Sequence, residues 1–557
     1  MITKILNTRL TRLVEEKELL NQSQIGFRPN QGTRQGVFTI GTLIEKAKAK
    51  KIPMVLTFVD LSAAYDSVNR QALFKAMNAL GLGGKVQQVI GSLYQNDRII
   101  FEVNNSTTKP LFLTQGVRQG CNLSPILFNI LLKQVADQLQ ESLTGVELDG
   151  EVISILLYAD DICLISSSAK MAKEAYGLLV KACDQVGMKV NQSKSQIVKK
   201  GDKGMAMLKD IPLEQVIVYK YLGVLVEIGR GQYMTRYSES RANKANTFVA
   251  STISLARNSP CPALFAWRVW RLVALPAILY GCETVLIRKR ELDDIEKAQS
   301  RVAKFILQVE QCTCNVVAQV LADFELVEVV YWRRVLNFYA DLHLADEDTW
   351  AKKAFNEAIE MEDQSNYISK IKFMLNILEV EGPKDLEEKL SRYAARKTNE
   401  ELRNRSTTCF VLSTVTATKP TLKSPLFGSD YISKTYHEFV TLNAQLGNRK
   451  PLDGYPRFVT CPICTDKDNC MNELHMLMLC SSLEEEREKQ GIRLFLDSRS
   501  EKSEVTVLYR DYWRNTANTE ILRIRVEAAA SMREAFLDKL GRLIIFKKKR
   551  RLIIMYY

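Results

Sequence analysis

The sequence has 557 residues, which exceeds the usual size of one domain, so we expect two to four domains. Lysine and arginine number 77 against 64 acidic residues, and the net charge of +13 is a modest bias toward a polyanionic partner. Hydrophobic residues at 46% and charged residues at 25% exclude a disordered or collagen-like chain. No uninterrupted apolar stretch reaches the roughly 18–20 residues of a membrane span, so we expect no membrane partner.

The N-terminal part mixes helical and β-rich patterns. The first 20 residues read as an amphipathic helix and lack the apolar core and cleavage site of a signal peptide. Residues 1 to 230 then contain three β-rich runs, at 53–61, 153–166 and 216–226. Strands that alternate with helices predict an α/β or α+β domain over this part of the chain.

The middle of the chain has a different texture. Between residues 231 and 405 apolar positions recur at helical spacing, as in ELDDIEKAQSRVAKFIL (291–307), and we interpret this region as helical. A Ser/Thr-rich stretch at 406–425 marks the boundary to a C-terminal part, 406–557. The sequence therefore predicts three regions.

Two basic runs leave their roles open. The first comprises Lys46, Lys48, Lys50 and Lys51, which form either a solvated helix face, the default, or a track for backbone phosphates. The second, Lys547 to Arg551 in the tail, is either a nuclear localisation signal or a phosphate-binding arm. We have no account of the isoleucines and tyrosines around that tail.

Three carboxylates carry the strongest chemical signal. Asp160 and Asp161 lie between two apolar, β-branched runs, which predicts a hairpin with this Asp pair at its turn. Asp60 ends another apolar run and is expected at the end of a strand. An Asp-Asp turn alone could merely cap a hairpin, but two strands that deliver carboxylates to one edge match a two-metal phosphoryl-transfer site.

These residues belong to an ordered set of motifs that resembles motifs A to E of reverse transcriptases. The set is FVDLSAAYDSV (58–68), TQGVRQGCNLSPILFN (114–129), YADD (158–161), VGMKVNQSKSQ (186–196) and YKYLG (219–223). The LSPILFN form, GFRP (26–29) and ILYGCET (278–284) resemble the polymerases of non-LTR (LINE-type) retrotransposons. The resemblance implies an α+β right-hand fold with palm and fingers over 1–230 and a helical thumb over 231–405.

The resemblance also implies a role for each matching position. Asp60, Asp160 and Asp161 would ligate two Mg²⁺, and Lys194 would donate a proton to the pyrophosphate leaving group, unless it is an ordinary solvated charge. Leu222 and Gly223 would hold the primer 3′ end. The incoming nucleotide would be contacted by Leu61, Ala63, Ala64, Tyr65, Gln119 and Gly120, with Tyr65 excluding a 2′-hydroxyl, and by Arg28 of the fingers, which is as readily a surface ion pair.

A second candidate metal site lies in the C-terminal part. Cys461, Cys464, His475 and Cys480 read C-x2-C-x10-H-x4-C, and such ligands suit tetrahedral Zn²⁺. The spacing is longer than that of the short retroviral knuckle and resembles the segment that follows the thumb in LINE-type polymerases. We therefore expect a small zinc-binding module within 406–557 whose metal is structural rather than catalytic.

The resemblance predicts an RNA-directed DNA polymerase that uses an RNA template, a DNA primer and dNTPs, within a ribonucleoprotein of the nucleus and cytoplasm. Family members usually begin earlier, so we expect that the first fingers segment is missing and that the chain is truncated at its N-terminus. We find no convincing endonuclease pattern, and we expect that this chain alone does not integrate. The alternatives are a catalytically inactive nucleic-acid-binding remnant and, less favoured by motif B, a polymerase that is template-independent or copies DNA. Oligomeric state is not predictable from the sequence.

Overall fold

The computed structural model describes residues 2–403 and 481–490, with gaps at 96, 104–105, 143–144, 200–210, 229–234, 310, 312, 314, 362–365 and 381–384, and single residues beyond 490. The chain divides into two compact units. The first comprises residues 1–240, 281–288 and 333–386, and the second comprises 241–280, 289–332 and the residues from 387 onward. Residues 333–386 thus belong to the first unit, although the sequence groups them with the helical region 231–405.

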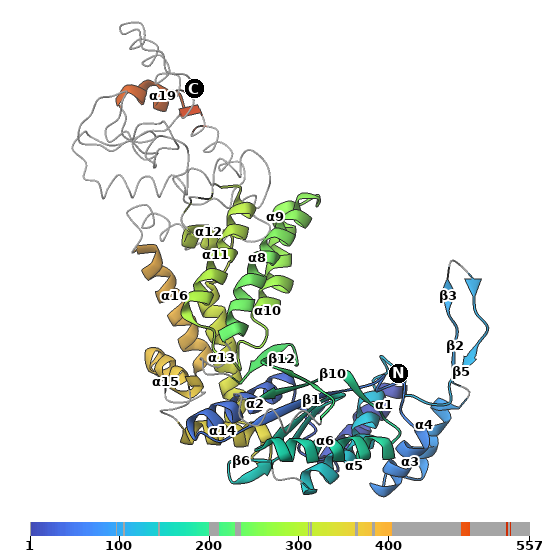
Figure 1. The fold of residues 1–557 in the computed structure, drawn as a ribbon. Coiled ribbons are helices and arrows are strands. Elements are labelled where there is room, and N and C mark those ends of the chain that lie inside the picture. The colour runs from blue at the N-terminus through green and yellow to red at the C-terminus, as the bar shows by residue number, and fades with distance from the viewer. Residues whose placement is uncertain are drawn as a thin grey trace. The chain divides into compact units, whose positions relative to one another are not determined.

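A five-stranded sheet forms the centre of the first unit (Figure 1). Its strand order is β11 (Glu214–Val216), β10 (Val190–Lys199), β1 (Val55–Leu61), β9 (Asp161–Ser166) and β8 (Ile155–Tyr158). β1 runs antiparallel to both of its neighbours, and β8 and β9 form a hairpin. The strands predicted within 53–61 and 153–166 are confirmed.

Helices cover the sheet and bury its apolar residues. α5 (Ser124–Ser142) and α6 (Ala169–Gln185) pack beneath it in Figure 1, and α3 (Arg70–Ala79) and α1 (Ile2–Glu16) pack on α5. The core that they share includes Val59, Leu127, Leu157, Ile162 and Leu164, all of which are buried. This packing holds the strand ends of β1, β8 and β9 in fixed positions.

Smaller β elements complete the first unit. β12 (Val218–Tyr221) and β13 (Val224–Glu227) form the hairpin predicted within 216–226. The others are two short ladders, β2 (Arg98–Ile99) with β5 (Leu111–Phe112) and β3 (Glu102–Val103) with β4 (Ser106–Thr107), which follow α4 (Lys85–Tyr94), and the hairpin β6 (Val146–Leu148) with β7 (Glu151–Ile153).

One basic residue has a different environment from that expected. α2 (Thr33–Ala49) packs against α14 (Trp350–Glu360), and Lys46 of α2 is only 3% exposed, with its Nζ 2.7 Å from Glu357. The expectation of a solvated face or a phosphate track is therefore wrong for Lys46. Lys50, half exposed, also reaches Glu357 at 3.3 Å. Glu357, which is distant in sequence, thus forms a buried ion pair with one lysine of this basic run.

The second unit is helical in its described part, as predicted. Trp270 and Gln299 form a buried hydrogen bond within it. Its elements are α8 (Thr235–Arg257, whose first residues belong to the first unit), α9 (Pro262–Val269), the π-helical turn η1 (Trp270–Ala274), α10 (Leu275–Ile278), α11 (Lys289–Leu307), α12 (Asn315–Leu321), the start of α13 (Val327–His343) and α16 (Leu386–Arg403).

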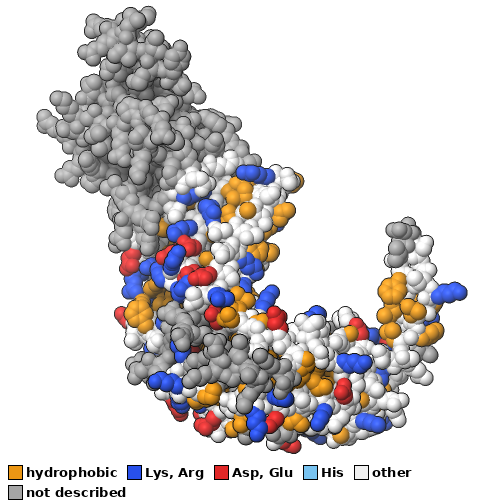
Figure 2. Space-filling model, viewed as in Figure 1, with side chains coloured by type: hydrophobic (Ala, Val, Ile, Leu, Met, Phe, Trp, Pro, Cys, Tyr) orange, Lys and Arg blue, Asp and Glu red, His pale blue; other side chains and the backbone are white. Residues whose placement is uncertain are grey.

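The remaining helices are α15 (Asn366–Leu378) in the first unit, and η4 (Ser481–Leu483) and α19 (Glu484–Lys489) beyond residue 480. Within the residues that the structure describes, every helix is too short or too polar to cross a bilayer. Charged side chains of both signs are spread over the surface shown in Figure 2.

Candidate active site

The predicted carboxylates converge at one end of the central sheet. β1 and β9 pair through Val59 and Ile162, so the next position along each strand places Asp60 beside Asp161. Asp160 occupies the tight turn between β8 and β9, where Tyr158 pairs with Asp161. Ala159 takes a positive φ of 55°, which gives this turn its sharp reversal. Three acidic side chains thus come from two neighbouring strands and one turn.

An irregularity in β10 brings Lys194 to the same edge. Phe58 pairs with Gln196 but Asp60 pairs with Asn191, so β10 contains extra residues opposite β1. The Asp60 amide donates to Ser195 Oγ at 3.1 Å, and Ser195 in turn donates to the Asn191 carbonyl. Bulges of this kind re-aim side chains. Here Lys194 Nζ lies 3.9 Å from Asp60 Oδ2, although its side chain is 70% exposed.

Negative charge is concentrated at this edge. Burial, with the charges of Asp160 and Asp60, raises the pKa of Asp161 to about 6. Burial and the charge of Asp160 raise the pKa of Tyr65 to about 12, and burial with Asp161 and Asp60 raises the pKa of Tyr219 to about 12. Hard carboxylate oxygens under such repulsion suit a divalent cation. Among the described residues, however, no three His, Cys, Asp or Glu side chains are already arranged as a metal cage.

The residues after Asp60 form a compact turn. Leu61 and Ala64 are buried, whereas Ala63 is exposed and has a φ of 46°. The Tyr65 ring stacks on Phe128 of α5, with centroids 4.9 Å apart and planes 7° apart. This stack fixes the orientation of the Tyr65 ring, and the charge of Asp160 acts on its hydroxyl.

Gln119 and Gly120 lie in the exposed loop before α5. Gln119 Nε2 donates to both carboxylate oxygens of Asp66 at 3.1 Å. Gly120 has a φ of 76° with open space where a Cβ would be, so the backbone conformation is what favours glycine here. The structure therefore ties the loop to the turn that carries Tyr65.

Aromatic rings of β12, in the β12–β13 hairpin, pack against β1, the strand that carries Asp60. Leu222 and Gly223 form the turn with φ values of 46° and 81°. Tyr219 stacks on Phe58 of β1, with centroids 4.2 Å apart and planes 7° apart, and Tyr221 lies 5.2 Å from the same ring. Sequence reasoning missed Tyr219, yet its alternation with Tyr221 was a usable signal that both face the sheet.

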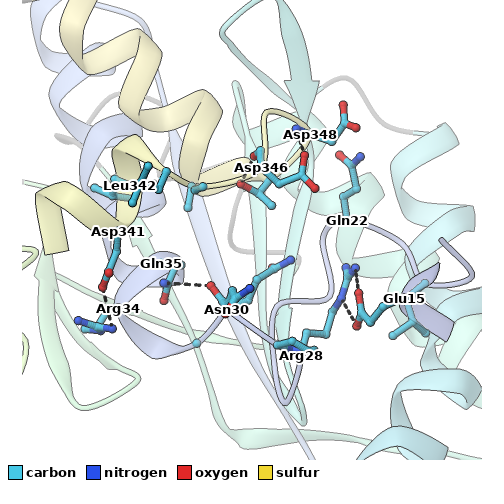
Figure 3. Close-up of a pocket in the computed structure, with 18 of the residues that line it drawn as sticks. Glu15, Gln22, Arg28, Asn30, Arg34, Gln35, Asp341, Leu342, Asp346 and Asp348 are labelled. Atoms are coloured by element: carbon cyan, nitrogen blue, oxygen red, sulfur yellow. Dashed lines mark hydrogen bonds and ion pairs between the residues drawn. The ribbon is translucent and has the colours of Figure 1, made fainter. Parts of the chain in front are cut away.

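Arg28 pairs with Glu15 (Figure 3) and not with Asp60, Asp160 or Asp161. Its guanidinium forms a two-pronged pair with Glu15 at 2.7 and 3.1 Å and is 12% exposed on its side chain. The preceding segment pairs with β8: the Ile25 amide donates to the Leu157 carbonyl and the Leu157 amide donates to the Ser23 carbonyl, at 2.9 and 2.8 Å. The ion-pair alternative describes Arg28 in this structure, and a triphosphate contact stays a prediction.

Cys461, Cys464, His475, Cys480 and the tail Lys547–Arg551 lie outside the described residues. The zinc module and the role of the tail stay predictions.

Comparison with known protein families assigns a class to the N-terminal part of the first unit. Residues 1–226 match the family of reverse transcriptases (RNA-dependent DNA polymerases). Together with the sheet and the carboxylates at its edge, this match defines a reverse transcriptase domain of mixed helix and sheet content.

Individual proteins are also similar to the chain. The chain is 27% identical over 236 residues to an uncharacterized 149 kDa protein of transposon TX1 from Xenopus laevis, covering 40% of this chain and 17% of that protein. It is 24% identical over 329 residues to a Pol polyprotein of the type-1 element R2 from Popillia japonica (57% and 44%), and 23% identical over 322 residues to an RNA-directed DNA polymerase of the jockey element from Drosophila funebris (55% and 34%). The chain thus spans less than half of each relative. These relatives are proteins of transposable elements.

Solved structures of telomerase are also similar. Apo telomerase from Candida tropicalis matches with a TM-score of 0.35 and 13% identity, covering 63% of this chain and 60% of that chain. Telomerase from Candida albicans in complex with a fragment of telomeric RNA matches with a TM-score of 0.30 and 11% identity, covering 55% and 54%.

Proposed function

We propose that the chain is an RNA-directed DNA polymerase of a non-LTR retrotransposon, which extends a primer 3′-hydroxyl with dNTPs on an RNA template. The observation that carries the proposal is the pairing of β1 with β9, which sets Asp60 beside Asp161 next to the Asp160 turn. Reverse transcriptases generally use divalent cations such as Mg²⁺, and these three carboxylates would hold them. Two bound cations would favour the nucleophilic form of the 3′-oxygen and stabilise charge on the leaving oxygen.

The other residues of the site would position the reactants. Tyr65, held by its stack on Phe128, would lie under the sugar and exclude a 2′-hydroxyl. The Leu222–Gly223 turn would hold the primer end, with the Tyr219 stack fixing its distance from β1. Lys194, beside Asp60, would give a proton to the pyrophosphate oxygen as it leaves, and Gln119 and Gly120 would line the nucleotide side.

Primer extension tests the proposal. The purified chain is given a DNA primer on an RNA template with Mg²⁺ and dNTPs, and is compared with Asp160→Asn and with Asp184→Asn. Asp184 is an exposed carboxylate at the end of α6 and provides the same chemical change away from the site. We expect extension by the parent and by Asp184→Asn and none by Asp160→Asn. Absence of extension by the parent, or equal extension by Asp160→Asn, would reject the proposal and favour a non-catalytic remnant.

Selectivity for the sugar of the incoming nucleotide gives a second readout of the same site. Tyr65→Ala should admit ribonucleotides that the parent excludes, because the rigid ring no longer meets the 2′-hydroxyl. Tyr65→Phe keeps the ring and the stack and should retain the exclusion. Extension with single rNTPs measures the difference.

A further inference from the structure

An exposed apolar hairpin follows α4 in the first unit. Its two ladders, β2 with β5 and β3 with β4, extend from the end of α4 as an arm (Figure 1). Figure 2 shows apolar side chains along this arm. The apolar residues that are between 40% and 67% exposed here are Ile99, Ile100, Phe101, Leu111 and Phe112. Since a two-stranded hairpin is at most marginally stable in water, such a surface indicates a partner.

The base of the hairpin is anchored to the body of the first unit. The carboxylate of buried Asp97 pairs with Arg70 at 2.8 Å and with Arg118 at 2.9 Å. The Arg70 guanidinium also donates to the carbonyls of Leu113 and Gly116, both at 2.9 Å. These bonds order the hairpin before any partner arrives, so binding requires less loss of conformational entropy.

The first strand of the hairpin has an open edge. The Leu113 amide donates to the Asp97 carbonyl at 2.8 Å, and the Thr108 amide donates to the Phe101 carbonyl at 2.9 Å. Backbone direction alternates along an antiparallel strand, so the even-numbered residues between 97 and 103 point their backbone groups outward. We call this row of groups the 98–102 edge. Within the described part of the chain, no further strand pairs with either ladder.

The opposite edge of the hairpin is blunted. The register shifts by one residue between the two ladders, so that Lys109 and Pro110 both lie opposite Ile100 and form a bulge. Proline has no N–H to offer, and a lysine charge and a bulge each resist the addition of another strand. The 98–102 edge, with the sequence RIIFE, has neither a proline nor an extra residue. The hairpin thus has one edge that is suited to pairing.

The 98–102 edge is complementary to itself. When two copies run antiparallel about a two-fold axis at Ile100, Arg98 of each copy lies opposite Glu102 of the other. Both of these charged side chains are exposed. Ile99 then lies opposite Phe101, and Ile100 lies opposite Ile100. The hydrogen-bonded pairs of this register are formed by the even-numbered residues, whose backbone groups point outward. Charge, apolar surface and backbone direction therefore agree on one alignment.

We propose that this chain forms a two-fold dimer in which the 98–102 edges of two copies pair as antiparallel strands and complete a four-stranded sheet. The assembly closes at two copies because the opposite edge of each hairpin is blunted. One positive and one negative charge leave the 98–102 edge without net charge, so it has little attraction for a phosphate backbone. The interface uses none of the residues proposed for polymerase chemistry, and the inference does not depend on that function.

Sedimentation velocity of the purified full chain over a range of concentrations tests the dimer. The parent should show a monomer–dimer equilibrium, and Ile100→Lys, which sets two lysines against each other on the axis, should weaken it about tenfold or more. Val152→Lys makes a matching change at an exposed apolar position on the separate β6–β7 hairpin and should leave it unchanged. A parent that stays monomeric up to roughly 100 μM, or equal association by Ile100→Lys, overturns the inference.

Charge reversal tests the register. Arg98→Glu sets glutamates opposite each other at both ends of the pairing, and Glu102→Arg sets arginines opposite each other, so each variant alone should associate about tenfold more weakly than the parent. An equimolar mixture of the two variants restores both opposite-charge pairs and should regain most of the parent's association. Mixing cannot rescue a chain that has merely lost its structure. A mixture that associates no better than its separate components contradicts the proposed pairing.

Other outcomes would assign the hairpin a different role. If Ile100→Lys changes the affinity for a primer–template while parent and variant are both monomers, the hairpin contacts nucleic acid and the dimer is refuted. Open-ended assemblies of the parent would refute closure at two copies. Asp160→Asn, inactive under the proposed function, should dimerise as the parent does. A dimer that does not extend a primer would therefore refute the polymerase alone, and a monomer that extends one would refute the dimer alone.

Discussion

Two clusters of polar side chains, one in each unit, differ in how their polar groups are satisfied. In the first unit, Asp60, Asp160 and Asp161 place negative charge together, and burial with this repulsion raises the pKa of Asp161 to about 6. In the second unit, Trp270 Nε1 donates to Gln299 Oε1 at 3.0 Å, and Gln299 Nε2 donates to Gln319 Oε1 at 2.8 Å.

This difference in how the polar groups are paired distinguishes a candidate functional site from a purely structural network. Within this network each of these donors meets an acceptor, and Gln319 Nε2 donates in turn to Ser300 Oγ at 2.6 Å. Such a network is complete without any ligand. The three carboxylates repel one another, so their folded arrangement costs free energy that a bound cation would recover. An unbalanced cluster indicates chemistry, whereas a satisfied one indicates architecture.

The largest effect is expected from a variant that removes one charge from the cluster of three aspartates. Asp161→Asn removes one charge of the repelling set and should lower primer extension by about a thousandfold, since metal ions supply several kcal/mol of charge stabilisation in such sites. In the absence of divalent cations its thermal unfolding midpoint should be equal to or above that of the parent. Asp184→Asn is the control for both measurements. A lower midpoint with full extension would show that Asp161 is structural.

A buried ion pair in the first unit provides the next largest effect. Glu357 and Lys46 are both about 3% exposed, and Glu357→Gln leaves the lysine charge buried without an anion, which should cost about 3–5 kcal/mol of unfolding free energy. Glu360→Gln, an exposed position on the same helix, should cost little. Chemical denaturation measures both, and equal stability of the two variants would contradict the buried pairing.

This pair also has a defined pH dependence. Burial by itself raises the pKa of Glu357, but hydrogen bonds from Lys46 and from the Asp149 amide lower it overall. Its contribution to stability is therefore present above the ordinary value of 4.5 and is lost as the pH falls through the lower folded-state pKa.

Local patterns predicted the carboxylate edge well, whereas long-range partners could not be foreseen. Asp60 and the Asp160–Asp161 pair each adjoin an apolar strand, so the strand ends located them before the pairing was known. Lys46 looked like a member of a solvated run because its partner Glu357 is 311 positions away. The Phe58–Tyr219 stack joins two strands whose register a single sequence does not specify.

A smaller effect is expected in the satisfied network. Gln299→Leu takes the acceptor from the indole N–H of fully buried Trp270 and the Gln299 donor from Gln319 Oε1, and should destabilise the second unit by about 1–3 kcal/mol. Primer extension below the unfolding range should change little. If the single variant is as stable as the parent, the network does not support the fold.

The smallest effect concerns Glu296, which is the nearest counterpart of Asp161 in the second unit. Burial raises its pKa to about 7, while hydrogen bonds from Gln319 and from the amides of Glu328 and Val327 oppose the rise and hold part of the charge. The unfolded chain loses this proton near 4.5, so stability should decline as the pH rises from about 4.5 through 7. Glu296→Gln should flatten that decline, and Glu388→Gln, exposed on α16, should not. Identical slopes in all three proteins would show that Glu296 ionises alike in the folded and unfolded states, which would leave the raised carboxyl pKa as a property of the carboxylate edge alone.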